Sequence, residues 1–114
     1  MLVRYEFALR KVISGGQAGA DQAGLVAAEA FGLETGGFAP TGFATVHGSA
    51  PELGSRYGLI EGGDYVARTW KNVRHSDATV RFASNFNSPG ELCTLRAINR
   101  FSRPYLDIQL PAQV

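Results

Sequence analysis

The sequence predicts a doubly wound α/β domain, with a mainly parallel sheet and helices on both faces. Strand-prone and helix-prone runs alternate along the chain, and turns rich in glycine follow some of the strand-prone runs. The 114 residues are 45% hydrophobic and only 18% charged, which suits one buried core and is too apolar for a disordered chain. We therefore expect residues 1–114 to form a single domain.

The first half of the chain predicts a strand, a helix and a weaker strand. Lys11–Ser14 is a short β-prone run that ends in two glycines, and the alanine-rich residues 19–31 indicate a buried helix. Residues 33–38 predict the weaker strand. Residues 39–63 are rich in Gly, Pro, Ser and Thr. A loop of that length is usually functional, or it contains a strand that the pattern does not reveal.

The second half predicts a helix, a strand, a helix and a final strand. Residues 64–75 have apolar side chains at helical spacing, and residues 78–83 give the clearest strand signal of the chain. Ser88-Pro89-Gly90-Glu91 predicts a helix start, with Ser88 as N-cap and Glu91 completing a capping box. Residues 104–110 predict the last strand.

Composition argues against several function classes. The net charge of +1 gives no bulk attraction to a nucleic acid polymer. No apolar run is long enough to span a bilayer, so we expect no membrane partner. The single cysteine, Cys93, cannot form an internal disulfide, which fits the cytoplasm. His47 and His75 have no ligand partners at metal-binding spacing, so no metal site is expected.

The first glycine turn, Ser14–Asp21, follows a predicted strand and opens a predicted helix. Its glycines allow a ligand to approach the backbone, and the helix amides attract an anion. The turn lacks both the Lys-Ser or Lys-Thr pair of a P-loop and the G-x-G-x-x-G spacing. The alternative is a plain strand-to-helix turn in which Asp21 favours the helix dipole. The candidate ligand-binding residues here are Gly15, Gly16, Gln17, Gly19 and Asp21.

The second candidate turn, Ser84–Glu91, offers polar side chains and backbone donors at another helix start. In doubly wound sheets ligands bind beyond the carboxyl ends of the strands, so the two turns are expected to face one crevice. The capping box alone also explains Ser88 and Glu91, and both interpretations stay open. The candidates from this turn are Asn85, Ser88, Gly90 and Glu91.

Arginines supply the remaining candidates. Residues 64–103 hold seven basic and three acidic side chains, and arginine suits phosphate and carboxylate groups. Arg68 and Asn72 share one stripe of their predicted helix, opposite Val66 and Trp70. The stripe either lines the crevice or is a solvated helix surface.

Four strings in order along the chain carry a family resemblance: VISGGQAGADQAGL, TGGFAPTGF, RTWKNVRHSDATVRFASNFNSPGE and RPYLDI. From about Lys11 to Leu110 the chain resembles the molybdenum carrier family, a YpsA-type branch of the SLOG superfamily that is related to the nucleotide-binding LOG proteins. The resemblance implies a Rossmann-like fold, a phosphate-bearing or otherwise anionic ligand at the glycine turns, and a homo-oligomer.

The resemblance also assigns roles by position. It places Gly15, Gly16, Gln17, Gly19 and Asp21 in the first loop, Arg68 and Asn72 on a helix stripe, Asp77 in the turn before a strand, and Ser88, Pro89, Gly90 and Glu91 in the second loop. The chain departs from the family pattern at Ala18, where Thr is usual, at Gln22, where Arg is common, and at Glu91, where many relatives have Thr. The loop around Thr41 to Pro51 also has TVHGS in place of an acidic string.

These observations lead to one main functional hypothesis and two alternatives. The main hypothesis is a small-molecule binding protein for a nucleotide or related phosphate ligand, with a molybdenum-cofactor-like pterin phosphate as one candidate. One alternative is a LOG-like N-glycosidase that acts on a nucleoside monophosphate, in which Glu91 would assist departure of the base. The other is a protein that sequesters a signalling nucleotide at the same site.

Overall fold

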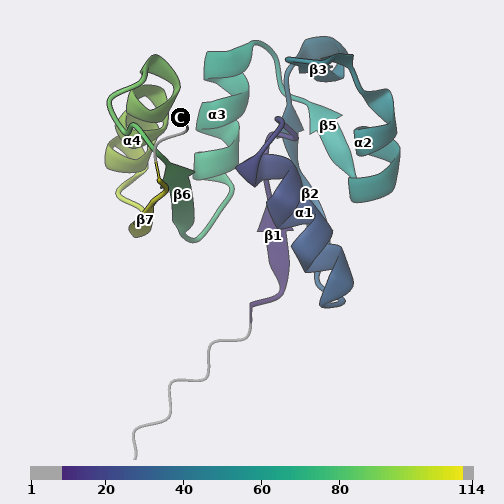
Figure 1. The fold of residues 1–114 in the computed structure, drawn as a ribbon, viewed down its shortest axis with the longest axis horizontal. Helices are drawn as coiled ribbons and strands as arrows, with labels where there is room; N and C mark the ends of the chain where they lie inside the picture. The colour runs from purple at the N-terminus through teal and green to yellow at the C-terminus, as the bar shows by residue number, and fades with distance from the viewer. Residues whose placement is uncertain (1–8, 112–114) are drawn as a thin grey trace, which may run out of the picture.

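Parallel strands organise the fold, which is given by a computed structural model that describes residues 9–111 (Figure 1). Strands β1 (Lys11–Ile13), β2 (Glu34–Ala39) and β5 (Leu59–Glu61) form one parallel sheet in the order β1-β2-β5. Strands β6 (Thr79–Ala83) and β7 (Tyr105–Gln109) form a second parallel pair. The predicted α/β class with parallel strands is confirmed.

Four helices cover these strands in the described part of the chain. Helix α1 (Ala20–Ala30) packs on β1 and β2, α2 (Pro51–Tyr57) packs on β2 and β5, and α3 (Tyr65–Arg74) lies against β2 and against α4 (Pro89–Phe101). All predicted helices are present within one or two residues of their expected bounds. Over residues 9–111, no helix has both the length and the apolar character needed to cross a membrane.

Residues 39–63, expected to be a long functional loop or to contain a hidden strand, are not a plain loop. This stretch contains the short 3₁₀ turn η1 (Thr41–Phe43), the hairpin of β3 (Ala44–Thr45) and β4 (Gly48–Ser49), helix α2 and strand β5. Pro51 occupies the first turn of α2, and Gly58 ends that helix in the left-handed conformation at φ 72°. The hidden strand that the loop length suggested is β5.

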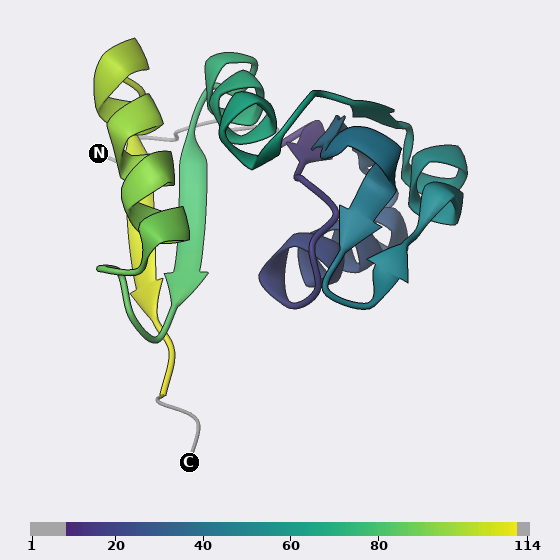
Figure 2. The ribbon, with the colours of Figure 1, turned by 90° about the horizontal axis from the view of Figure 1, so that it is seen from above.

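A single continuous sheet was also expected, but the described strands form two separate parallel sheets. Their spatial sequence, β5-β2-β1 followed by β6-β7, corresponds to the 3-2-1-4-5 order of a doubly wound fold with a break after its first strand. Figure 2 shows the two groups on opposite sides of α3. A cleft of about 960 Å³ lies at the break and is lined by residues of β1, α3 and β6.

Asn72 fixes α3 to the first sheet. The Phe38 amide donates to Asn72 Oδ1 at 2.8 Å, and Asn72 Nδ2 donates to the Phe38 carbonyl at 2.9 Å. Ser14, the residue after β1, still pairs with Gly36 through its amide. Beyond that point the chain turns into the glycine loop, so the side chain of Asn72 replaces the missing strand neighbour of Phe38.

The buried side chains form two clusters, one in each half of the molecule. Leu25, Ala39, Tyr57 and Leu59 are buried together between α1, α2 and the first sheet. Val73, Ala97 and Ile98 are buried between α3 and α4, with Trp70 and Phe101 packed against them. Trp70 is half-buried, and its ring meets that of Phe101 edge to face at 5.7 Å.

Candidate functional site

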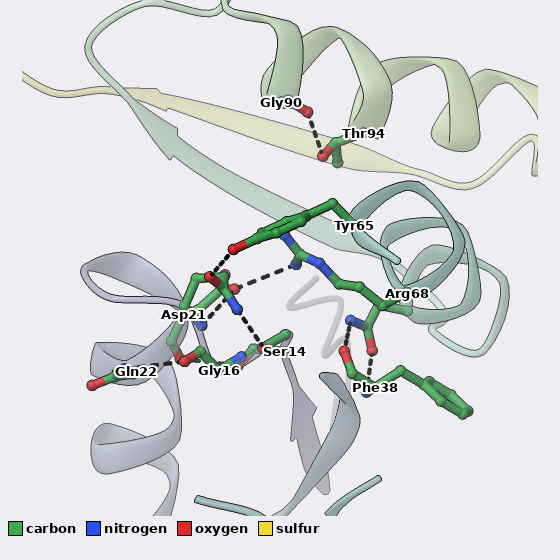
Figure 3. Close-up of polar contacts among 12 residues, drawn as sticks. Ser14, Gly16, Asp21, Gln22, Phe38, Tyr65, Arg68, Gly90 and Thr94 are labelled. Atoms are coloured by element: carbon green, nitrogen blue, oxygen red, sulfur yellow. Dashed lines mark hydrogen bonds and ion pairs between the residues drawn. The ribbon is translucent and has the colours of Figure 1, made fainter. Parts of the chain in front are cut away.

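The first glycine turn is closed by hydrogen bonds between its own residues (Figure 3). Ser14 Oγ donates to the Asp21 carbonyl at 3.0 Å and accepts from the Gly16 amide at 3.3 Å. The Gln17 amide donates to Asp21 Oδ2 at 3.2 Å. Gly16 and Gly19 have φ values of 73° and 93°, a region that favours glycine. These hydrogen bonds and glycine conformations define the shape of the turn.

Two glutamine side chains hold this turn to its surroundings. Gln17 Nε2 donates to the carbonyls of Gly15 at 3.3 Å and Ala44 at 3.0 Å, and Gln17 Oε1 accepts from the Tyr65 hydroxyl at 3.3 Å. Gln22 Nε2 donates to the Gly16 carbonyl at 3.0 Å. The side chain of Gln17, a predicted ligand contact, is thus engaged in positioning the turn.

Arg68 crosses from α3 to the first turn. Its side chain is only 15% exposed, and Nη1 lies 3.6 Å from Asp21 Oδ2. The guanidinium carbon is 5.3 Å from the centre of the Tyr65 ring. Nε is buried and has no hydrogen-bond partner within residues 9–111. A Cβ on Gly15 would overlap Arg68 Nη1, so this glycine is what allows the arginine to lie against the turn.

The second turn opens α4 as the sequence predicts, but only half of the capping box forms. Ser88 Oγ accepts from the Glu91 amide at 3.4 Å. The Glu91 carboxylate does not return to the Ser88 amide and instead lies 3.3 Å from Arg81 Nη1. Asn85 is used locally, since its Oδ1 accepts from the Asn87 amide at 2.9 Å.

Arg81 is the charged residue that the sequence reasoning missed. Its side chain is 4% exposed and donates to both carboxylate oxygens of Asp107 at 2.7 and 2.6 Å. It also donates to the Glu91 carbonyl at 2.9 Å. Alternation with apolar Val80 and Phe82 indicates only that Arg81 lies on the opposite face of the strand. That pattern predicts an exposed arginine, so the burial of Arg81 had no signal in the sequence.

The environment of Glu91 favours its neutral form. Burial raises the pKa of the Glu91 carboxyl, Arg81 partly offsets that rise, and the charges of Asp107 and Asp21 add to it. The pKa of Arg81 is raised, chiefly by its hydrogen bonds to Asp107. Glu91 is therefore easier to protonate than an ordinary glutamate, although a cation lies beside it.

The two turns and Arg68 line one cleft of about 560 Å³. Figure 3 shows Gly90 and Thr94 of α4 facing the turn around Asp21, with Tyr65 and Arg68 between them. The predicted residues in this cleft are Gln17, Asp21, Arg68, Gly90 and Glu91, and the lining residues that were not predicted include Tyr65, Thr69, Cys93 and Thr94.

The other candidates lie around this cleft rather than in it. Gly15, Asn72 and Asp77 line the 960 Å³ cleft between β1 and β6, which shares Asp21, Arg68, Thr69 and Thr94 with the first. Gly16, Gly19, Asn85 and Ser88 line neither cleft and shape the two turns instead. The side-chain amide of Asn72, which shares a helix stripe with Arg68, is hydrogen-bonded to the backbone of Phe38.

Comparison with known proteins identifies the family. The model of the circularly permuted YpsA family of SLOG proteins matches residues 12–114. The chain belongs to this family. A crystal structure of a putative molybdenum carrier protein from Syntrophus aciditrophicus SB is 37% identical, with a TM-score of 0.81 over 90% of this chain. The chain spans 65% of the length of that protein. No curated protein matches it.

Proposed function

We propose that this protein binds a small phosphate-bearing anion, such as a nucleotide, in the cleft between the first turn and the start of α4. The observation that carries the proposal is Arg68. Its guanidinium is largely buried at the edge of a cleft. Among residues 9–111 its one ion-pair partner is the Asp21 carboxylate, which is 3.6 Å away and also accepts from the Gln17 amide. A buried cation with unused donors favours an anionic ligand.

The start of α4 adds a second attraction for negative charge. Gly90 lies in the first turn of a 13-residue helix and lines the same cleft, where helix amides and the helix dipole favour an anion. The solved relative is described as a putative molybdenum carrier protein. A molybdenum-cofactor-like pterin phosphate has an anionic group that these donors fit, so it is one candidate ligand beside nucleotides.

Calorimetric titration with adenosine monophosphate, inorganic phosphate and molybdate tests the proposal. We expect Arg68→Ala to weaken binding of the phosphate ligand by about 1.5 to 3 kcal/mol, the range for hydrogen bonds to charged groups. The matched control is Arg74→Ala, which removes the same charge from an exposed position of the same helix. If Arg68→Ala and Arg74→Ala bind the phosphate ligand with equal affinity, Arg68 does not contact the ligand and has only a structural role.

The position of Glu91 supports a second candidate function, an N-glycosidase that acts on a nucleoside monophosphate. Its carboxylate lies in the cleft with a raised pKa instead of capping α4, as a group that donates a proton to a departing base requires. Chromatography of nucleoside monophosphates incubated with the protein tests this candidate. Base release by the parent that is lost in Glu91→Gln would favour the enzyme over the binding protein.

A further inference from the structure

Unpaired backbone groups of β1 face the cleft at the break between the two sheets. Within residues 9–111, β1 pairs only with β2. The Ser14 amide donates to the Gly36 carbonyl and the Glu34 amide donates to the Arg10 carbonyl, so the even-numbered residues along β1 turn their backbone groups toward β2. In a parallel ladder the alternate residues point the other way. The amide and carbonyl of Ile13, which lines the cleft, therefore point away from β2 and offer a donor beside an acceptor.

The cleft at the break is continuous with the candidate anion site. The two clefts share four residues, Asp21, Arg68, Thr69 and Thr94. Arg68 lies against Gly15, and Ile13 precedes Gly15 by two residues, which is about 7 Å along an extended strand. A ligand held by Arg68 in the first cleft can therefore extend into the second, where it meets the backbone of Ile13.

Apolar side chains surround this position. Val73 follows Arg68 by five residues of α3, which is about 7.5 Å along the helix axis, so it lies at a similar depth to Ile13. Both residues line the cleft together with Val80 of β6, whose side chain is 53% exposed. Asn72 also lines the cleft, but its side chain is bonded to the backbone of Phe38. Apolar walls beside a free donor and acceptor suit a flat ring with polar atoms on its edge.

We propose that the cleft between β1 and β6 holds a heteroaromatic ring of the anionic ligand, and that the ring pairs with the backbone amide and carbonyl of Ile13. This inference rests on the proposed function, because Arg68 holds the phosphate group at the other end of the same molecule. It narrows the ligand to compounds whose ring bears a hydrogen-bond donor beside an acceptor, as adenine and guanine do. A sugar phosphate without such a ring would occupy the first cleft only.

Calorimetric titration with four phosphate compounds tests this class of ligand. Adenosine and guanosine monophosphate carry the donor beside the acceptor, purine riboside 5′-monophosphate keeps the ring without any donor on it, and ribose 5-phosphate has no ring. We expect the tighter-binding of the two nucleotides to exceed purine riboside 5′-monophosphate in affinity by about fivefold, through the lost hydrogen bond. It should exceed ribose 5-phosphate by about tenfold or more, because burial of the ring adds to the hydrogen bonds.

Ile13→Pro tests the contact itself. Proline removes the amide hydrogen of residue 13, which takes no part in pairing with β2. We expect the substitution to weaken the tighter-binding nucleotide by about fivefold and to leave ribose 5-phosphate unchanged. The matched control is Gln109→Pro, because the Leu110 amide donates to β6, so that the Gln109 amide faces the outer edge of β7 and its residue lines neither cleft.

Hydrogen exchange in the unmodified protein gives a second measurement, which decides if Ile13→Pro does not fold. Exchange of the Ile13 amide, followed by NMR, should become slower with the nucleotide and not with ribose 5-phosphate. An Ile13 amide that is protected without any ligand would overturn the inference, because the open edges of β1 and β6 then pair with each other. An amide whose exchange the nucleotide does not slow would overturn it as well.

The titrations separate failure of this inference from failure of the proposed function. Nucleotides that bind no more tightly than ribose 5-phosphate or purine riboside 5′-monophosphate, while Arg68→Ala still weakens them, would refute the ring site and leave the anion site standing. Equal loss of nucleotide affinity in Ile13→Pro and Gln109→Pro would also refute it. If none of the four compounds binds, the proposed function fails and the ring site fails with it.

Discussion

Replacement of Asn72 by alanine tests whether one side chain holds α3 on the first sheet. The substitution removes two hydrogen bonds, at 2.8 and 2.9 Å, and leaves both the amide and the carbonyl of Phe38 without their partner. An intramolecular hydrogen bond contributes about 0.5 to 1.5 kcal/mol, and an unsatisfied buried group costs about 1 to 3 kcal/mol. Because Phe38 and Asn72 are half-buried, we expect Asn72→Ala to lower the free energy of unfolding by about 2 to 4 kcal/mol.

Urea-induced unfolding, followed by circular dichroism, measures this loss. The matched control is Asn99→Ala on the exposed side of α4, which should change stability by about 0.5 kcal/mol or less. Asn72→Asp keeps an acceptor for the Phe38 amide but turns a carboxylate oxygen toward the Phe38 carbonyl. The loss of stability caused by Asn72→Asp should therefore be smaller at acid pH, where the protonated carboxyl can donate to the Phe38 carbonyl. If Asn72→Ala is as stable as Asn99→Ala, the reasoning is refuted.

Two further predictions concern Glu91 and Gly37. Burial raises the folded-state pKa of Glu91 above its usual 4.5, so its contribution to stability is full at acid pH and is lost as the pH rises through the folded value. Glu91→Gln should thus be more stable than the parent at pH 7 and lose this advantage below pH 4.5. Denaturant unfolding of both proteins at the two pH values measures the difference in their free energies of unfolding. A difference that does not change with pH would contradict a raised pKa of Glu91. Gly37 has a φ of 129° and a Cβ there would overlap the Ser14 carbonyl, so Gly37→Ala should cost about 2 kcal/mol or more in thermal unfolding. The control is Gly32→Ala, at φ 70° with open space around it, which should cost only about 1 kcal/mol. Equal losses of stability in the two variants would show that the overlap with Ser14 does not contribute.

Elements with a signal of their own were predictable from the sequence. Ser88 and Pro89 specify the start of α4 through the geometry of a single turn, and the apolar spacing of residues 64–75 specifies α3. β5 and α2 escaped prediction. β5 is no shorter than β1, which was predicted, but β5 lies within a stretch rich in Gly, Pro, Ser and Thr that resembles a loop. Its pairing with β2 depends on residues elsewhere in the chain.

Residues of the candidate site were likewise predictable only where the local sequence carried a signal. The glycine turns, Arg68 and Glu91 could be proposed because residue type and position beside a helix start indicate anion chemistry, and the structure brings several of them to one cleft. The partners of Asn72 and Arg81 could not be proposed. Asn72 meets a backbone 34 residues away and Arg81 meets a carboxylate 26 residues away, and helical or strand spacing carries no information about such pairs.

The two buried clusters have a consequence for motion within the molecule. α3 belongs to both halves, since Asn72 is bonded to β2 while Val73 is buried against α4. A change in the separation of the halves is therefore a hinge movement at this helix, and it opens or narrows the space between Asp21 and Gly90. A ligand that touches both residues fixes that separation. Binding then stabilises the two buried clusters together. Hydrogen exchange should therefore become slower at amides of α1 and α4 that do not contact the ligand.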